Sequence, residues 1–135
     1  MGIEIKRRHD LKIGQTVTFD HAELIADVPE SEGGDGAGAS PHDLYDAALG
    51  ACKALTVMWY ARRKQFPVED VAVRIDRDAS QERSGTYTLT ATVRVSGPLS
   101  DAQLQELHAV AEKCPIHKLM TAVTTTIRTD VLRMT

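Results

Sequence analysis

The sequence predicts an α+β fold, because two kinds of hydrophobic periodicity alternate along it. Period-two alternation, typical of strands, occurs near the N-terminus, in the middle and near the C-terminus. Spacings of three and four, typical of helices, occur in two stretches between these regions. The expected order is βββ-α-ββ-α-β, without an internal repeat. A chain of 135 residues is long enough for a single domain, residues 1–135, that buries a core without disulfides.

The first 39 residues predict a small antiparallel meander followed by a loop. Ile3 and Ile5 alternate with polar residues, Val17 and Phe19 do the same, and a third apolar run follows in AELIADV. The next stretch, PESEGGDGAGA, holds four of the nine glycines among acidic residues. We expect a flexible connection there, in a position suited to cover a site.

A long helix is predicted to begin at Pro41 and to end before Pro67. Ser40 offers an N-cap hydroxyl, and Asp43 lies in the first turn, where the positive end of the helix dipole favours an acid. The basic run RRK suits the other end. Cys52 is expected to face inward. The other residues expected on that face are Leu44, Ala47, Ala48, Ala51, Leu55, Met58 and Trp59.

The centre of this helix is rich in small residues, with Gly50 among them. A glycine inside a helix costs about 1 kcal/mol relative to alanine, which is typical of places where another backbone comes close. The single sheet of a 135-residue chain has little surface with which to cover such a helix. We therefore expect a second copy of the chain to bury part of it, in a homodimer.

The second half of the chain predicts a hairpin and another helix. Residues 71–75 and 87–95 alternate apolar and polar side chains, and the polar segment RDASQERSG joins them. Ser100 and Gln103 then form a capping-box signature. The helix that follows is expected to turn inward Leu104, Leu107, Ala111 and Cys114.

The end of the sequence predicts a closing strand. Pro115 interrupts the second helix, and a short turn or helix is expected through IHKLM. The run VTTTIRTDVL then alternates again, with Val123, Ile127 and Val131 on one face.

Composition narrows the classes of function. The net charge of −3 and the pI near 5.9 provide no basic field for nucleic acid. No apolar run approaches the roughly 18 to 20 residues of a membrane span, and the start MGIEIKRRHD lacks the apolar core of a signal peptide. We therefore expect a cytoplasmic protein without nucleic-acid or membrane partners. In that reducing compartment, two cysteines favour redox chemistry, metal ligation or packing over a permanent bridge.

The two cysteines leave more than one interpretation open. A cysteine on the apolar face of a helix is more often an inert small hydrophobe than a nucleophile. Cys114, however, is expected to point inward as well, and two inward thiols in one small domain can exchange a disulfide reversibly. Peroxide reduction needs a thiolate, an apolar path, a group that holds the thiolate and a second thiol that captures the sulfenic acid.

The histidines suggest other roles. His42 precedes Cys52 by ten residues, about 15 Å along a helix, so it can act on that sulfur only in a partner subunit or through an intermediate. Its default role is that of an exposed residue in the first turn. Cys114 and His117 have a Cys-x-x-His spacing, which with His42 and Cys52 would give four zinc ligands. Paired Cys-x-x-Cys spacing is absent, so we expect no metal.

Three stretches resemble a known family. GGDGAGASPHDLYDAALGACKALTV is similar to the glycine-rich loop and cysteine-bearing helix of the OsmC/Ohr superfamily, whose members are thiol-dependent hydroperoxide reductases, and AEKCPIHKLM is similar to its second cysteine motif. MWYARRKQFPVEDVAV looks most like the OsmC-like branch. The resemblance implies antiparallel sheets around long central helices in an intertwined homodimer, with two sites at the subunit interface.

The resemblance also implies roles for individual residues. Cys52 occupies the peroxidatic position and Cys114 the resolving one. Arg8 lies at about the distance of the family's activating arginine, and His42, followed by Asp43, stands where well-studied members have a glutamate. No metal, haem or other cofactor takes part in the family's reaction, and dithiols of the lipoyl type or small thiols regenerate the enzyme.

These observations together predict a thiol peroxidase that reduces organic hydroperoxides through Cys52 and Cys114. One alternative is a non-catalytic module of the same fold that binds a hydrophobic ligand at the dimer interface. The other is a redox-sensing thiol protein that reacts once.

Overall fold

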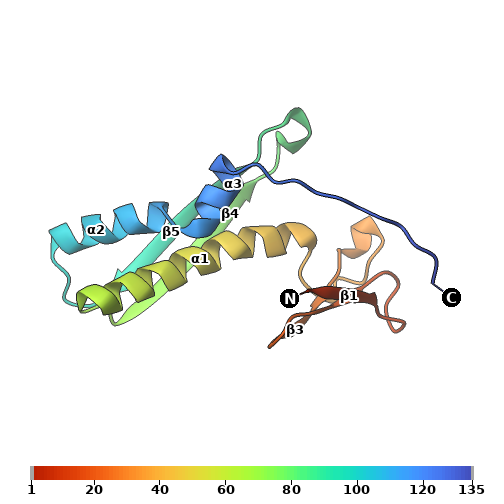
Figure 1. Ribbon diagram of the computed structural model, residues 1–135, viewed down its shortest axis with the longest axis horizontal. Coiled ribbons are helices and arrows are strands. Elements are labelled where there is room, and N and C mark those ends of the chain that lie inside the picture. The colour runs from red at the N-terminus through yellow and green to blue at the C-terminus, as the bar shows by residue number, and fades with distance from the viewer. Residues whose placement is uncertain (1, 135) are drawn as a thin grey trace. The chain divides into compact units, whose positions relative to one another are not determined.

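Five strands and three α-helices form within residues 2–134, the part of the chain that the computed structural model describes (Figure 1). The predicted α+β class is confirmed. In chain order the elements are β1 (Glu4–Arg7), β2 (Gln15–Thr18), β3 (Glu23–Ala26), the 3-10 turn η1 (Glu30–Glu32), α1 (Pro41–Lys64), β4 (Asp70–Asp78), the 3-10 turn η2 (Glu82–Ser84), β5 (Thr88–Ser96), α2 (Asp101–Glu112) and α3 (Pro115–Ala122).

The chain divides into two compact units. The first comprises the residues up to Gly50 together with Ile75–Ala91, and the second comprises Ala51–Arg74 together with the residues from Thr92 onward. Helix α1 and strands β4 and β5 each contribute residues to both units. That residues 1–135 form one domain therefore stays a prediction.

The first unit contains the expected meander. Strands β1, β2 and β3 are antiparallel neighbours in that order, with Val17 opposite Ile5 on one side and Leu24 on the other. Val17 is buried, whereas Ile3 and Ile5 are exposed. The alternation of the sequence thus gives the correct strands, and one face of β1 remains uncovered in the single chain.

The glycine-rich loop is folded around a buried carboxylate, which the expectation of a flexible connection missed. Asp27 accepts backbone hydrogen bonds from Val28 at 2.8 Å, Ala37 at 3.1 Å and Asp35 at 3.2 Å. A Cβ atom at Gly34 would overlap the carbonyl oxygen of Val28, so a side chain does not fit there. The amide of Ala37, with those of Val28 and Asp35, holds the pKa of Asp27 below its usual range.

These amide contacts predict that Asp27→Asn loosens the loop. The asparagine keeps a single acceptor oxygen, so the urea midpoint at pH 7 should fall. Folding lowers the pKa of Asp27, so its carboxylate stabilises the fold fully above the unfolded-state pKa of about 3.9. This stabilisation is lost as the pH falls through the folded-state pKa. The midpoint difference from wild type should shrink between pH 5 and pH 2. Exposed Asp20→Asn is the control; an equal effect there would contradict the assignment.

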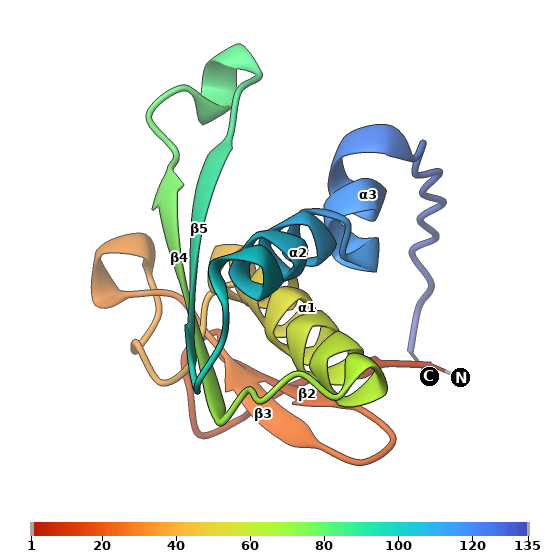
Figure 2. The ribbon, with the colours of Figure 1, turned by 90° about the vertical axis from the view of Figure 1, so that its left-hand side faces the viewer.

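The second unit has a hydrophobic core built by two helices and the hairpin. Val57 and Ala61 of α1 pack with Leu107 and Ala111 of α2, and this packing explains why α2 runs beside the Ala51–Lys64 part of α1 in Figures 1 and 2. The partly buried residues that surround this cluster are Tyr60, Phe66, Val68, Val71, Val93, Val95 and Leu99.

Helix α1 begins and ends where the sequence predicts. Ser40 Oγ accepts from the amide of Asp43 at 3.1 Å, and the Asp43 carboxylate accepts from the amide of Ser40 at 3.0 Å, which satisfies two amides at the start of the helix. Arg62, Arg63 and Lys64 occupy its last turn. Neither α1 nor any other helix within residues 2–134 is long and apolar enough to cross a membrane.

The buried face of α1 differs from the predicted one. The single chain buries Asp46, Leu49, Gly50, Lys53, Val57 and Ala61. Leu55 and Trp59, expected inside, are 70% and 59% exposed. The prediction was wrong because it treated charged residues as outward, whereas Asp46 and Lys53 are buried with hydrogen-bonding partners. Cys52 lies at the edge of the buried face and is half-buried.

The hairpin and the capping box are confirmed. Strands β4 and β5 form a two-stranded sheet, and both show the expected alternation of half-buried and exposed residues. Ser100 Oγ accepts from the amide of Gln103 at 3.1 Å, and the Gln103 side chain accepts from the amide of Ser100 at 3.0 Å. The expected short helix after Pro115 is α3.

The predicted closing strand does not form within the described residues. From residue 123 to residue 134 the chain has no strand assignment, and Figure 1 draws this segment without an arrow. Ile127 and Val131 are 80% and 92% exposed. Alternation alone does not make a strand, because the backbone also needs a neighbouring strand for its hydrogen bonds, and this segment pairs with none of the five described strands.

Candidate active site

Cys52 lies on α1 with its sulfur at the start of another helix. The amide of Ile116, in the first turn of α3, donates a hydrogen bond to Cys52 Sγ over 3.5 Å. Thr56 Oγ1, one turn further along α1, lies 4.0 Å from the same sulfur. The Cys52 sulfur therefore has a hydrogen-bonding environment on a half-buried face, which an inert core cysteine does not require.

Cys114 occupies the N-cap position of α3 and is 0% exposed. Its carbonyl accepts from the amide of Lys118 at 3.3 Å, and Pro115 follows at the first helical position. Both cysteines are free thiols. Because Ile116 is only two residues beyond Cys114, the contact from Ile116 to Cys52 brings the segment that carries the second thiol to the first.

The Cys52 sulfur accepts from the first turn of α3. Pro115 has no amide hydrogen, so Ile116 provides the first available donor of α3, and the Cys52 sulfur satisfies it. Cys52, Cys114 and the start of α3 thus belong to one unit of the chain.

Lys53 and His117 also lie at this corner, and the sequence prediction missed the lysine. Lys53 is 5% exposed and its ammonium contacts His117. The one signal in the sequence is that this lysine stands among small apolar residues, in ALGACKALTV. Because lysines are usually exposed, this signal was not used.

Arg8 belongs to the other unit and follows strand β1. Its guanidinium donates to the two carboxylate oxygens of Asp10, at 3.2 and 3.0 Å, and to Thr16 Oγ1 at 3.2 Å. The hydrogen bond to Asp10 raises the pKa of Arg8 and lowers that of Asp10. The arginine is thus held by a carboxylate, and its assignment to a thiol site stays a prediction.

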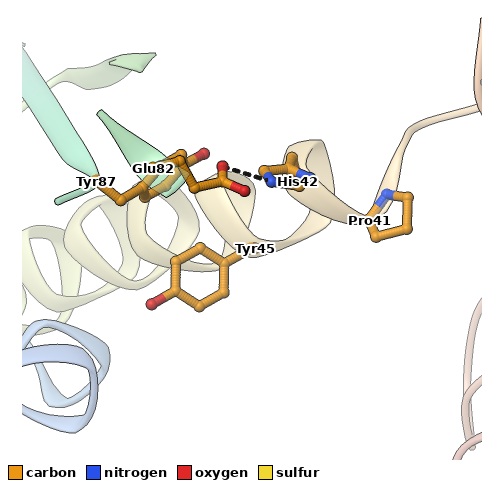
Figure 3. A pocket seen from close by; sticks show the side chains of 5 residues that line it. All are labelled: Pro41, His42, Tyr45, Glu82 and Tyr87. Atoms are coloured by element: carbon orange, nitrogen blue, oxygen red, sulfur yellow. Dashed lines mark hydrogen bonds and ion pairs between the residues drawn. The ribbon is translucent and has the colours of Figure 1, made fainter. Parts of the chain in front are cut away.

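His42 lines a pocket in the first unit. Its Nε2 lies 2.8 Å from Glu82 Oε1, which joins the first turn of α1 to the turn η2 (Figure 3). The pocket has a volume of about 380 Å³. Its walls are formed by Pro41, His42, Tyr45, Glu82 and Tyr87. His42 therefore has a specific partner, where the sequence suggested a plain exposed residue, and its assignment to catalysis stays a prediction.

An ion-pair network supports the wall of this pocket. Arg77 of β4 binds the carboxylate of Asp43 and also donates to Asp46 Oδ2 over 2.7 Å. The hydroxyl of Tyr87 donates to Asp46 Oδ1 over 2.7 Å. The pKa of Asp43 is lowered, mainly by the amide of Ser40 and then by Arg77. Burial and the hydrogen bond to Asp46 raise the pKa of Tyr87 to about 12. The Tyr87 ring is thereby fixed at its hydroxyl end.

This raised pKa predicts how Tyr87→Phe behaves in alkali. The neutral phenol stabilises the fold fully below the unfolded pKa of about 10, and this contribution is lost as the pH rises through about 12. The urea midpoint of Tyr87→Phe should lie below that of wild type at pH 8, and the difference should shrink above pH 10. Tyr45→Phe, at an exposed ring, should change little. A difference that grows above pH 10 would contradict the assignment.

Within residues 2–134, no three or more His, Cys, Asp or Glu side chains are grouped so that they could hold a metal ion. The contacts given above for His42 and His117 are with Glu82 and Lys53, respectively.

Comparison with known proteins agrees with this fold. A family model described as "OsmC-like protein" matches residues 33–129, and the chain belongs to the OsmC-like family. That match includes Cys52, Cys114 and His42 but not Arg8. The expectation drawn from the sequence motifs is confirmed at the level of the family.

Solved structures show the same fold at low sequence identity. An OsmC-like protein from Mycoplasma pneumoniae has a TM-score of 0.72 and 19% identity, over 90% of this chain and 87% of that one. A candidate osmotic stress induced and detoxification response protein from Psychrobacter arcticus 273-4 has a TM-score of 0.73 and 18% identity, over 90% and 89%. The organic hydroperoxide resistance protein OhrB of Bacillus subtilis has a TM-score of 0.58 and 19% identity, over 90% and 92%.

Proposed function

We propose that this protein is a thiol-dependent peroxidase that reduces organic hydroperoxides through Cys52 and Cys114. One observation supports it above the others: the Ile116 amide donates to the Cys52 sulfur from a helix whose N-cap is the second cysteine. Membership of the OsmC-like family and the fold shared with an organic hydroperoxide resistance protein favour the same substrate class.

The proposed first step is attack by the Cys52 thiolate on the distal oxygen of the hydroperoxide. A sulfur–oxygen bond forms, the oxygen–oxygen bond breaks, and the alkoxide leaves as the alcohol after it takes a proton from water. Cys52 becomes a sulfenic acid. The Ile116 amide donates to the sulfur that makes this attack.

In the second step, the Cys114 thiol attacks the sulfenic sulfur and releases water as the disulfide forms. A dithiol of the lipoyl type, or small thiols, then reduces the disulfide by exchange, and the reductant leaves oxidised. The net reaction converts one hydroperoxide and one dithiol into one alcohol, one water and one disulfide. We place it in the cytoplasm, where such reductants are abundant.

Arg8 and His42 are proposed as accessory residues of this reaction on the strength of the family resemblance. Their present partners are carboxylates, Asp10 for Arg8 and Glu82 for His42. At the position of the family's glutamate, therefore, the histidine is accompanied by a carboxylate from the β4–β5 turn. Loss of turnover in Arg8→Ala, measured beside Arg7→Ala, tests the assignment of the arginine.

The protein is further proposed to act as a homodimer. Leu55 and Trp59 lie one turn apart on α1 and are mostly exposed in the single chain. The alternating segment at residues 123–134 is likewise exposed and does not pair with the described strands. Apolar surface of this kind is typical of an interface, and a second copy would offer both a cover and a strand partner.

Turnover with two peroxides tests the proposed activity. Reduced protein is supplied with dihydrolipoamide and either cumene hydroperoxide or hydrogen peroxide, and consumption of each peroxide is followed. We expect multiple turnovers, with a higher kcat/KM for the organic hydroperoxide. Reaction with the organic hydroperoxide no faster than that of free cysteine would overturn the proposal.

A second candidate, a ligand-binding module, is favoured by the pocket beside His42. The pocket has two tyrosine rings and a proline, and its volume of about 380 Å³ suits a small apolar molecule. Cumyl alcohol is a suitable probe. Binding of this alcohol to wild type, weakened in Tyr87→Ala and accompanied by no peroxide turnover, would favour the module over the enzyme.

A further inference from the structure

Lys53 is a buried charge next to the thiol pair. It follows Cys52 directly in the sequence and is 5% exposed. Burial of an ammonium is costly unless its donors are satisfied, and a methionine of similar length would fill the same space without that cost. Packing alone therefore does not explain why a lysine occupies this position.

The ammonium of Lys53 binds two other helices. Its Nζ donates to the carbonyl oxygen of Ala111 over 2.8 Å, in the last turn of α2, where carbonyl groups lack helical partners and the helix dipole favours a cation. The same Nζ lies 3.1 Å from Nδ1 of His117, in the first turn of α3. An ammonium can only donate, so Nδ1 of His117 is the acceptor of this hydrogen bond. One side chain of α1 thus links α2 to α3.

The two residues that Lys53 contacts, Ala111 and His117, flank the segment that carries Cys114. Ala111 and His117 lie on either side of Cys114 in the sequence, and Ile116, immediately before His117, is the donor to Cys52 Sγ. Because Lys53 is adjacent to Cys52, the lysine fixes this segment to the same turn of α1 that carries the first thiol.

We propose that Lys53 is a positioning residue for the Cys52–Cys114 exchange, which holds Cys114 and the Ile116 amide at the Cys52 sulfur. This inference rests on the proposed function for its biological purpose. The expected effect is a higher effective concentration of the Cys114 thiol at Cys52. The fold already orders the segment that carries Cys114, so disulfide formation costs less conformational entropy. His117 is the second half of the same device, as the acceptor that orients the ammonium.

The test measures the thiol–disulfide equilibrium in glutathione buffers, which needs no peroxide. The reaction converts the two protein thiols and one oxidised glutathione into the protein disulfide and two reduced glutathiones. The variants are Lys53→Met, His117→Leu and the double variant. Val57→Ala is the control, since Val57 is fully buried one turn along α1 in the neighbouring core and has no role in the exchange.

We expect the effective thiol concentration to fall about tenfold in Lys53→Met, which loses both contacts, and by less in His117→Leu, which loses one; the double variant should be no worse than Lys53→Met, because the contact to His117 is already absent there. Val57→Ala should lower the urea midpoint and leave the equilibrium unchanged. This control separates a positioning role from a general loss of stability.

Two results would overturn the positioning role. One is a thiol–disulfide equilibrium constant in Lys53→Met that equals the wild-type constant. The other is the failure of the wild-type protein to form a Cys52–Cys114 disulfide in the glutathione buffer. Failure of the peroxidase proposal is a different outcome, since a protein that ignores hydroperoxides can still show the expected loss in the glutathione experiment.

Discussion

Cys52→Ser should abolish the turnover of organic hydroperoxide. A serine hydroxyl is not ionised near neutral pH and cannot take the oxygen as a sulfenic acid, so the first step has no nucleophile. We expect the rate to fall by more than about 10³-fold, to the level of the buffer and the reductant alone. Consumption of cumene hydroperoxide in the presence of dihydrolipoamide measures this effect.

Cys114→Ser is the matched variant for this experiment. It keeps the attacking thiol and the Ile116 donor to it, and lacks only the proposed resolving thiol. It should undergo one rapid oxidation and then accumulate sulfinic acid, detectable as a mass increase on the peptide that contains Cys52. Turnover of wild-type magnitude in Cys52→Ser would contradict the mechanism, whatever the behaviour of Cys114→Ser.

Leu55→Glu combined with Trp59→Glu should convert a dimer into a monomer. The wild-type protein is expected to sediment at twice the chain mass of 14.8 kDa, because exposed apolar residues gathered on one helix, as Leu55 and Trp59 are, are typical of an interface. Two carboxylates on that surface would have to be desolvated in the interface, which opposes association strongly. Sedimentation equilibrium at several concentrations measures the effect.

The control for this prediction is Gln105→Glu, a change of charge at an exposed position on α2. It should leave the mass unchanged. A wild-type protein that sediments as a monomer at tens of micromolar would contradict the dimer proposal. Circular dichroism of the double variant distinguishes a folded monomer from a chain that has lost its helices.

The sequence predicts the elements of this fold well where local chemistry determines them. Ser40 and Pro41 specify the start of α1, and the Ser100–Gln103 pair specifies the start of α2, because caps and prolines act within a few residues. The strands of the meander follow from alternation. Each of these features depends on neighbours in the sequence, so a single sequence is enough to find it.

Other features could not be predicted because they depend on distant partners. Asp46 and Lys53 have the charges of surface residues, and only Arg77 and Tyr87 for the first, or Ala111 for the second, explain their burial. Five alanines along α1 give little directional signal, so they could not offset the assumption that the charged residues face outward, and the face that the single chain buries was missed. The segment at residues 123–134 alternates correctly but has no strand beside it among the described residues.

The candidate site divides in the same way. Cys52 and Cys114 were predicted as the reactive pair from their helical positions and the family resemblance, and this assignment stays a prediction; the structure adds that the Ile116 amide, two residues after Cys114, donates to the Cys52 sulfur. Lys53 was missed because a lysine is usually exposed. The partner of His42 was missed because Glu82 lies 40 residues away in a turn whose conformation the sequence does not specify.

A single oxidation experiment tests the central claim most directly. Reduced protein is treated with one equivalent of cumene hydroperoxide, free thiols are counted under denaturing conditions, and the disulfide is mapped by mass spectrometry of the digested chain. We expect both thiols to be lost together, faster than with hydrogen peroxide, into one bond between Cys52 and Cys114 within a chain. Survival of both thiols for hours, or a bond only between two chains, would contradict it.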